Sequence, residues 1–336
     1  MTPTRIGLMG FGRIGRNMFR LLHGREDIVV AAINDVADPE ALTYLLKYDS
    51  MYGRFPGKLS YGDGALDHDG RPVLFGTAMT PADTDWSAAD VDIVFDTTSR
   101  YRSQESLQGH LDSGARHVVL TSSPEVPGEI PLLLRGVNDD ILDPAPPIVA
   151  MGSNTANAAA PVLQALDEEF GLQRVFITTV KAMSKSGRLA DVPSDSFRTS
   201  RSAAENIIPS ETNSAEIITQ VLPSLEGKLL VVSMNVPVAD GSTVDMVAEV
   251  GRETTAEEVN NAMEKAVGVI PEVLEFVADP IVSSDVRMNS HSGVFDSLAT
   301  MVTGGTLVKT VTWFNNGWGY SHRVVEVAER IAGGVK

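Results

Sequence analysis

The 336-residue sequence contains no cysteine. Without a thiol the chain cannot form a disulfide, bind a metal through thiolates or use cysteine as a nucleophile. It also lacks an apolar run near the roughly 20 residues of a membrane span, and residues 1–15 lack the basic and apolar segments of a secretory signal. We therefore expect a cytoplasmic protein with no membrane partner.

Basic residues are scarce relative to acidic ones. The 27 lysines and arginines face 44 aspartates and glutamates, which gives a formal net charge of −17. Nucleic acids and anionic membranes would repel such a surface, so we expect no nucleic-acid partner. We interpret the excess of acidic side chains as a feature that keeps the protein soluble.

The six histidines are far apart in the sequence. None of them shows a spacing typical of metal ligands: His23, His68, His110, His117, His291 and His322. Since cysteine ligands are also missing, a structural zinc site is not expected. The sequence therefore predicts no metal site.

The first half alternates apolar strands with helical patterns. The stretch "RIGLMG" is a short apolar strand, "RIGRNMFRLLHG" has helical spacing, and "IVVAAIND" is a second strand that ends in polar residues. Further strands are expected at "DIVFDTT" and "HVVLTSS". This alternation predicts an α/β fold: a Rossmann domain with a doubly wound parallel sheet, whose ligand lies at the carboxyl ends of the strands.

The second half is richer in long β-runs. Four stretches have this character: "RVFITTVKAM", "KLLVVSMNVPV", "STVDMVAEVG" and "LVKTVTWFNN". Long strands with few helices between them predict a C-terminal α+β domain with a large mixed or antiparallel sheet. The polar segment 185–209 is too long for a connecting turn, and segments of this kind usually have a function or contact a partner.

A phosphate-binding fingerprint, "GFGRIG", lies between the first strand and the first helix. Its glycines permit a tight turn and a close approach of the backbone to a pyrophosphate at the helix N-terminus. The predicted cofactor-binding residues here are Gly10, Phe11, Gly12, Arg13, Ile14 and Gly15. Asn34 and Asp35 end the next strand about 20 residues further on, where a carboxylate accepts ribose hydroxyls and repels a 2′-phosphate. We therefore predict NAD rather than NADP, although Asp35 could instead cap a turn.

A second strand-to-helix turn, "GSNTANAAAP", begins at residue 152. Turns of this kind present backbone N–H groups and short side chains to a ligand, and they often carry a nucleophile. This one offers Ser153, Asn154, Thr155 and Asn157, none of which is strongly nucleophilic.

Five motifs in this order, "IGLMGFGRIGRNMFR", "AAIND", "LLKYDSMYGRF", "RSAAENIIPSET" and "WFNNGWGYSHRVVE", resemble the phosphorylating glyceraldehyde-3-phosphate dehydrogenase family over essentially the whole chain. The resemblance implies an NAD-binding Rossmann domain at 1–151, a catalytic-like domain at 152–319 and a C-terminal helix at 320–336 that returns to the NAD domain. It also implies a homotetramer, with segment 185–209 reaching a neighbouring subunit.

The resemblance places Asn154 where the family has its catalytic cysteine and Lys181 where it has its catalytic histidine. An amide cannot replace a thiolate as a nucleophile, so the family's thioester chemistry is not expected here. The resemblance also assigns residues to the binding of a substrate anion, some retained from the family and some changed: Ser153, Thr155, Ser184, Thr212, Asn213 and Asn235. Asn235 stands where the family has an arginine, which removes a charged phosphate contact.

The cofactor contacts are better retained. By resemblance, Asn316 holds the nicotinamide carboxamide and Thr98 lines the cleft. Ser122 and Tyr320 complete the expected NAD site. The pattern is selective, because the dinucleotide contacts persist while the nucleophile, the base and a phosphate contact are replaced.

Three hypotheses follow for the function. The first is an NAD-dependent oxidoreductase that acts without covalent catalysis on a small anionic carbonyl or alcohol, with Lys181 as acid or base and Asn154 holding the substrate oxygen. The second makes the dinucleotide, or a derivative of it, the substrate. The third is an inert NAD-binding assembly protein, in which Lys181 only fills space and bonds to Asn154.

Overall fold

The computed structural model describes residues 2–183, 187–194 and 196–333. The chain forms two compact units. The N-terminal unit consists of Met1–Leu133, Asp139–Gly152 and Ser321–Lys336, and the C-terminal unit consists of Leu134–Asn138 and Ser153–Tyr320. The functional domain boundaries given above stay a prediction, because compactness does not show what a unit binds.

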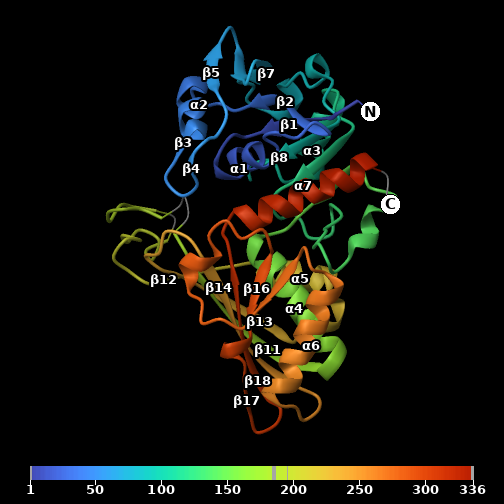
Figure 1. Cartoon of the computed structure of the whole chain (residues 1–336), viewed down its shortest axis with the longest axis vertical. Coiled ribbons are helices and arrows are strands. Elements are labelled where there is room, and N and C mark those ends of the chain that lie inside the picture. The colour runs from blue at the N-terminus through green and yellow to red at the C-terminus, as the bar shows by residue number, and fades with distance from the viewer. Residues whose placement is uncertain (1, 184–186, 195, 334–336) are drawn as a thin grey trace. The chain divides into compact units, whose positions relative to one another are not determined.

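The N-terminal unit is built on an eight-stranded sheet with the order β10-β9-β8-β1-β2-β7-β6-β5. Strands β8, β1, β2, β7 and β5 of this sheet are labelled in Figure 1. Neighbouring strands from β10 to β7 are parallel, and β7, β6 and β5 are antiparallel. The strands are β1 (Thr4–Met9), β2 (Ile28–Asn34), β5 (Leu59–Gly62), β6 (Ala65–His68), β7 (Arg71–Gly76), β8 (Ile93–Asp96), β9 (His117–Leu120) and β10 (Ile148–Ala150). A separate ribbon pairs β3 (Tyr48–Asp49) with β4 (Gly53–Arg54).

Helices α1 (Arg13–Leu21), α2 (Pro39–Lys47) and α3 (Gln104–Asp112) connect these strands. The register aligns the strand ends, because Met9 of β1 pairs with both Asn34 of β2 and Asp96 of β8. The carboxyl ends of the three central strands therefore meet at one edge of the sheet, which is where ligands bind in folds of this type.

The C-terminal unit is built on a mixed sheet with the order β12-β13-β11-β14-β18-β16-β15, and β17 pairs with β18. The strands are β11 (Leu172–Lys181), β12 (Ile208–Ser210), β13 (Leu229–Asn235), β14 (Ser242–Val250), β15 (Leu274–Val277), β16 (Gly293–Asp296), β17 (Met301–Thr303) and β18 (Leu307–Phe314). Its helices are α4 (Asn154–Phe170), α5 (Ser214–Val221) and α6 (Ala256–Val269). Helix α7 (Trp318–Gly333) follows the last strand and belongs to the N-terminal unit from Ser321 on.

Helix α4 packs against β11, β14, β16 and β18. Strand alternation explains which side of the sheet is covered: Val175 and Ile177 of β11 are buried, whereas Phe176 between them is exposed. Lys181 ends β11 in the same alternating set as Val175 and Ile177. The end of the strand therefore carries a charged side chain on the buried side of the sheet.

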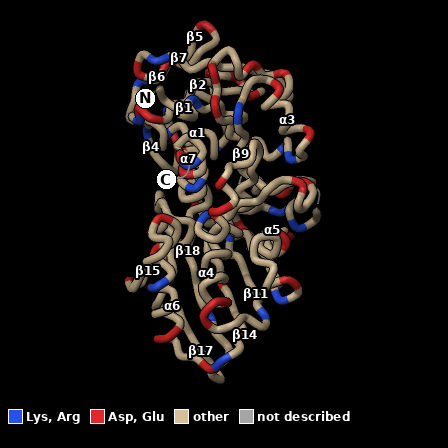
Figure 2. The backbone as a smooth tube through the Cα atoms, turned by 90° about the vertical axis from the view of Figure 1, so that its right-hand side faces the viewer, with Lys and Arg blue, Asp and Glu red and all other residues tan. Residues whose placement is uncertain are grey.

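The predicted fold class is confirmed: an N-terminal Rossmann sheet, mostly parallel, and a C-terminal domain with a mixed sheet. Aspartate and glutamate residues are distributed along the backbone of both compact units (Figure 2). Of the helices in the described part of the chain, none combines the length and apolar character that crossing a membrane requires.

Candidate active site

The turn between β1 and α1 is shaped by its glycines. Gly10 has φ +90°, which a residue with a side chain rarely adopts. A Cβ on Gly15 would lie 2.4 Å from the Gly10 carbonyl oxygen, so the helix can pass this close only without a side chain. Gly12 forms the N-cap of α1 without a side-chain bond, and a Cβ there would meet nothing within 4 Å. The helix N-terminus therefore faces open space and can accept an anion.

Asp35 lies beside this turn. Its Oδ2 accepts a hydrogen bond from the Phe11 N–H at 2.6 Å, and its Oδ1 accepts one from the Ala37 N–H at 2.9 Å. The carboxylate thus fixes the glycine turn, and its remaining lone pairs can accept ribose hydroxyls. Asn34 has a supporting position, because its amide both donates to and accepts from the backbone of Ala78.

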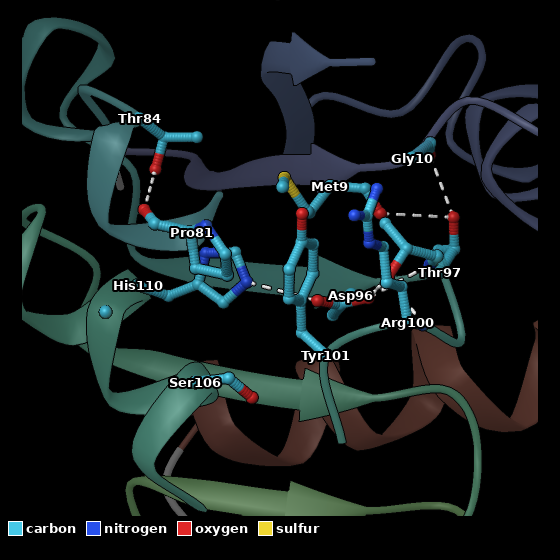
Figure 3. A network of polar contacts seen from close by, with 12 residues as sticks. Met9, Gly10, Pro81, Thr84, Asp96, Thr97, Arg100, Tyr101, Ser106 and His110 are labelled. Carbon is cyan, nitrogen blue, oxygen red and sulfur yellow. Dashed lines mark hydrogen bonds and ion pairs between the residues drawn. The ribbon is translucent and has the colours of Figure 1, made fainter. Parts of the chain in front are cut away.

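A buried polar network lies next to the glycine turn, at the carboxyl end of β8 (Figure 3). The Trp86 Nε1–H donates to His110 Nδ1 at 2.9 Å, and His110 Nε2 lies 3.3 Å from Asp96 Oδ2. Because indole is only a donor, His110 Nδ1 must accept, and Nε2 carries the proton toward Asp96. Asp96 Oδ1 in turn accepts from the N–H and the hydroxyl of Thr98, and Thr97 Oγ1 donates to the Gly10 carbonyl at 2.8 Å. The network therefore positions Thr98 and the glycine turn.

In the C-terminal unit, two helices begin close together. Ser153 caps α4 by accepting from the Ala156 N–H, and its Oγ lies 3.5 Å from the Oγ of Ser214, the first residue of α5. Ser214 Oγ lies 2.8 Å from Thr212 Oγ1. Thr155 Oγ1 is buried without a hydrogen-bond partner among the described residues. Two positive helix ends and a chain of hydroxyls suit an anionic group.

Asn154 is held by a network at the start of α4. Its Nδ2 donates to the Asn316 carbonyl at 2.9 Å, and its Oδ1 accepts from the Thr155 N–H. The Asn316 side chain accepts from the Ser242 hydroxyl and donates to the Ala182 carbonyl at 3.4 Å. The Ala182 N–H donates to Ser242 Oγ at 3.0 Å. These contacts fix the backbone immediately after Lys181.

Lys181 itself is largely buried, and burial lowers the pKa of its amine. Across the described ranges, no hydrogen bond or ion pair involves the Lys181 amine, and none joins it to Asn154. Its neighbour in the sheet register is Asn235 of β13. A desolvated amine without a counter-ion exchanges protons more easily near neutral pH than a solvated lysine.

Comparison with known proteins agrees with this geometry. Residues 4–104 match the NAD binding domain of glyceraldehyde 3-phosphate dehydrogenase, and residues 153–316 match the C-terminal domain of the same enzyme. Glyceraldehyde-3-phosphate dehydrogenase 2 of Streptomyces avermitilis is 41% identical over 326 residues, which cover 96% of this chain and 97% of the relative. The glyceraldehyde-3-phosphate dehydrogenases of Geobacillus stearothermophilus and Haloarcula vallismortis are each 40% identical, over 98% of both chains in each case.

This chain belongs to the glyceraldehyde-3-phosphate dehydrogenase family. The family consists of NAD-dependent oxidoreductases, and NAD is the cofactor. The N-terminal unit fits the dinucleotide: the uncapped α1 N-terminus has room for a pyrophosphate, and Asp35 is placed to accept ribose hydroxyls. The Ser122 hydroxyl, just after β9, is buried without a hydrogen-bond partner among the described residues, and its role in NAD binding stays a prediction.

The other site residues predicted for this chain lie in different surroundings. Ser184 lies outside the described residues. Asn213 is exposed at the start of α5, and Asn235 donates to Ser210 Oγ at 3.1 Å. Tyr320 is buried in the first turn of α7, and burial raises the pKa of its phenol. The roles assigned to these residues stay predictions.

Sequence reasoning missed Ser214 and Ser242. Ser214 is 1% exposed and joins the hydroxyls of Ser153 and Thr212, and Ser242, also 1% exposed, links Asn316 to the end of β11. Ser214 could have been found from its position at the start of a helical pattern. Nothing local in the sequence indicates Ser242, because its partners are 60 and 74 residues away.

Proposed function

We propose that this chain is an NAD-dependent oxidoreductase that acts without covalent catalysis on a small anionic carbonyl or alcohol. The observation that carries the proposal is Lys181, a largely buried amine whose pKa is lowered by burial. The relatives are named glyceraldehyde-3-phosphate dehydrogenases. Because this chain has no cysteine, however, it cannot form a thioester as a covalent intermediate on a thiolate.

In this mechanism Lys181 moves the proton of the reaction. When the substrate is an alcohol, the neutral amine takes the hydroxyl proton as the carbonyl forms, and in the reverse direction the ammonium returns it. Bound NAD supplies the hydride chemistry. The second N–H of the Asn154 amide can donate to the substrate oxygen, since Asn316 engages only one of the two.

The start of α4 provides the site for the anionic group. The hydroxyls of Ser153, Ser214 and Thr212 form one chain, and the Thr155 hydroxyl is buried beside them without a partner among the described residues. A phosphate or carboxylate would complete these hydrogen bonds and face two helix N-termini. A small pocket of about 30 Å³ beside Asn235 includes Arg188 and Arg201, which can supply the positive charge that Asn235 lacks.

The test measures absorbance of reduced nicotinamide with phosphorylated and carboxylated aldehydes, ketones and polyols. Turnover is expected with at least one substrate, and Lys181→Met is expected to lower kcat by about 10²- to 10⁴-fold. The matched control is Lys309→Met, because Lys309 lies in the same sheet and pairs with Asp245 rather than facing the site. Turnover unchanged in Lys181→Met would overturn the proposal.

Further results of these assays distinguish the proposed oxidoreductase from the other hypotheses. If NAD or NADH is altered in mass without any second substrate, the dinucleotide is the substrate, and the proposal is wrong. If NAD binds but the whole panel is silent, the inert NAD-binding protein is favoured. Conversion of glyceraldehyde 3-phosphate, NAD and inorganic phosphate to an acyl phosphate would also contradict the proposed mechanism.

We also propose a homotetramer. One face of the C-terminal sheet is buried, and the opposite face exposes Phe176 and Leu230. These two residues pair in register on β11 and β13 and are 47% and 65% exposed. Large apolar side chains side by side on a sheet face favour a protein contact. Light scattering should give the mass of four chains, and Leu230→Asp should lower it. A monomer at micromolar concentration would overturn this assignment.

A further inference from the structure

Two of the dispersed histidines meet at the far end of α1. His23 follows the helix by two residues, His68 is the last residue of β6, and Asp69 begins the turn into β7. His23 Nδ1 and His68 Nε2 lie 2.8 Å apart. Asp69 Oδ2 lies 3.9 Å from His23 Nδ1 and 3.4 Å from His68 Nε2. In the described part of the chain, this is the one group of at least three His, Asp or Glu residues whose donor atoms all lie within 4.8 Å.

These distances can be compared with a metal site. Zinc–nitrogen and zinc–oxygen bonds are about 2.0–2.2 Å, so neighbouring ligand atoms of a tetrahedral site lie about 3.4 Å apart. The three observed separations, 2.8, 3.4 and 3.9 Å, bracket that value. A small rotation of the His23 ring away from His68 and toward Asp69 would equalise them. The metal would then replace the proton that the two imidazoles now share.

The cluster is held together by its surroundings. The Phe55 ring packs against both imidazoles, with its centroid 4.8 Å from that of His23 and 5.6 Å from that of His68, and the Phe19 centroid lies 5.1 Å from that of His68. A Cβ on Gly57 would lie 2.6 Å from Asp69 Oδ2 and 2.9 Å from His23 Cε1, so a glycine is needed for this close approach. Asp69 has φ +53° in the hairpin turn, and its Oδ1 accepts from the Lys58 N–H. The donor atoms are therefore placed by the fold rather than by chance rotamers.

The cluster lines a pocket of about 330 Å³, which gives a metal and its remaining water ligands access. His23 and His68 are about a fifth exposed, and Asp69 is 43% exposed. Arg25 and Arg71 also line the pocket, and Glu26 provides a further acidic side chain there.

We propose that His23, His68 and Asp69 form a binding site for a divalent first-row transition metal, with zinc as the expected occupant. Two imidazoles and one carboxylate suit zinc, cobalt or nickel better than magnesium or calcium, which prefer oxygen ligands. Three protein ligands leave a position for water. Bound metal would tie the end of α1 to the β6–β7 hairpin. All three ligands lie in the N-terminal unit, which carries the dinucleotide turn. Because a ligand that binds only the folded state stabilises it, the metal would stabilise this unit.

The experiment uses the full-length chain without an affinity tag, treated with a chelator and then dialysed. Zinc or cobalt is titrated by calorimetry, and cobalt is also followed by its visible absorption. One equivalent per chain is expected, together with a tetrahedral cobalt spectrum and a higher melting temperature with zinc. His68→Gln is expected to weaken binding by about 100-fold or more, and Asp69→Asn by about 10-fold.

The matched control is His117→Gln, because His117 lies in the same unit, outside the cluster, with its Nδ1 near the Pro146 carbonyl. It should bind zinc like the unchanged protein. NAD binding by each variant shows that the unit is folded. Absence of saturable binding would leave only a hydrogen-bonded histidine pair and overturn the proposal. So would a zinc affinity that His68→Gln does not change.

Discussion

The chain has two strand–turn–helix junctions that begin with a glycine at positive φ, one before α1 and one before α4. Gly10 has φ +90° and Gly152 has φ +62°. At α1 the cap is Gly12 and makes no side-chain bond, so the turn offers backbone N–H groups alone. At α4 the cap is Ser153, whose hydroxyl caps the helix and approaches a second helix.

The difference between the junctions is one of locality. The α1 turn presents its own backbone, which is held by Asp35 and by the Thr97 hydroxyl. The α4 turn acts through side chains gathered from separate segments, including Ser214 and Asn316. Changes near α1 should therefore affect stability and cofactor binding, whereas changes near α4 should affect substrate binding and turnover.

The largest effect is expected from His110→Ala. The variant leaves the Asp96 carboxylate, which is fully buried, without its imidazole partner. The free energy of unfolding, measured by denaturant unfolding, should fall by about 3 kcal/mol or more, because a buried charged acceptor loses its hydrogen bond. NAD affinity should fall as well, because Asp96 positions Thr98. Unchanged stability would show that the network does not support the α1 junction.

Gly15→Ala should act next most strongly, and mainly on NAD. The added methyl group would collide with the Gly10 carbonyl, so the turn must open. We expect NAD affinity to fall about 100-fold, or about 2.7 kcal/mol, measured by calorimetry. Gly62→Ala is the control, because a Cβ there meets nothing within 4 Å and Gly62 has no positive φ. Equal NAD affinities for the two variants would contradict the geometry of the turn.

Ser214→Ala should affect the α4 junction alone. It removes the hydroxyl between Ser153 and Thr212, so the affinity for inorganic phosphate should fall about 3- to 10-fold, consistent with one hydrogen bond. NAD affinity should stay the same. Ser224→Ala is the control, because that hydroxyl donates to Asp167 on the surface. A loss of NAD affinity as large as that of phosphate affinity would remove the contrast between the junctions.

The smallest effect is the pH dependence of stability due to Lys181. Burial lowers the folded-state pKa of its amine below the unfolded value of about 10.4. Between these two pKa values the unfolded chain binds more protons, so stability rises with pH there. The buried amine destabilises the fold most below the folded-state pKa and has no such effect above the unfolded value. Lys181→Met should be more stable than the unchanged chain at neutral pH, and the gain should shrink toward pH 10.4. Denaturant unfolding at several pH values measures this difference in unfolding free energy. A difference that does not change with pH would show that burial of the Lys181 amine does not destabilise the fold.

Much of the fold could be predicted from local patterns. The glycine turn, the strand that ends in Asp35 and the β-rich second half all come from periodicity and residue type over short stretches. The antiparallel β5–β7 edge was not predicted. Its turn residues Asp69 and Gly70 are a hairpin signal, but β5 and β6 are only 4 residues long each, too short to show a clear alternation.

The candidate sites were less accessible to sequence reasoning. Lys181 and Asn154 were found by resemblance, but the Asn316 and Ser242 contacts that fix their surroundings join residues 60 or more positions apart. The spacing of the histidines predicts no metal site, yet the fold brings His23 and His68 into contact across 45 residues. Sequence spacing identifies ligands only when they lie on one local element.

By itself, the sequence determined which chemistry is absent and which backbone turns are possible. Without cysteine there is no thiolate, and only glycine allows the turn at Gly10 and the approach at Gly15. Tertiary structure alone decided that Lys181 is desolvated, that Ser153 meets Ser214, and that His23 meets His68. The physical reason is range: backbone conformation depends on neighbouring residues, whereas burial and side-chain contacts depend on segments that only folding brings together.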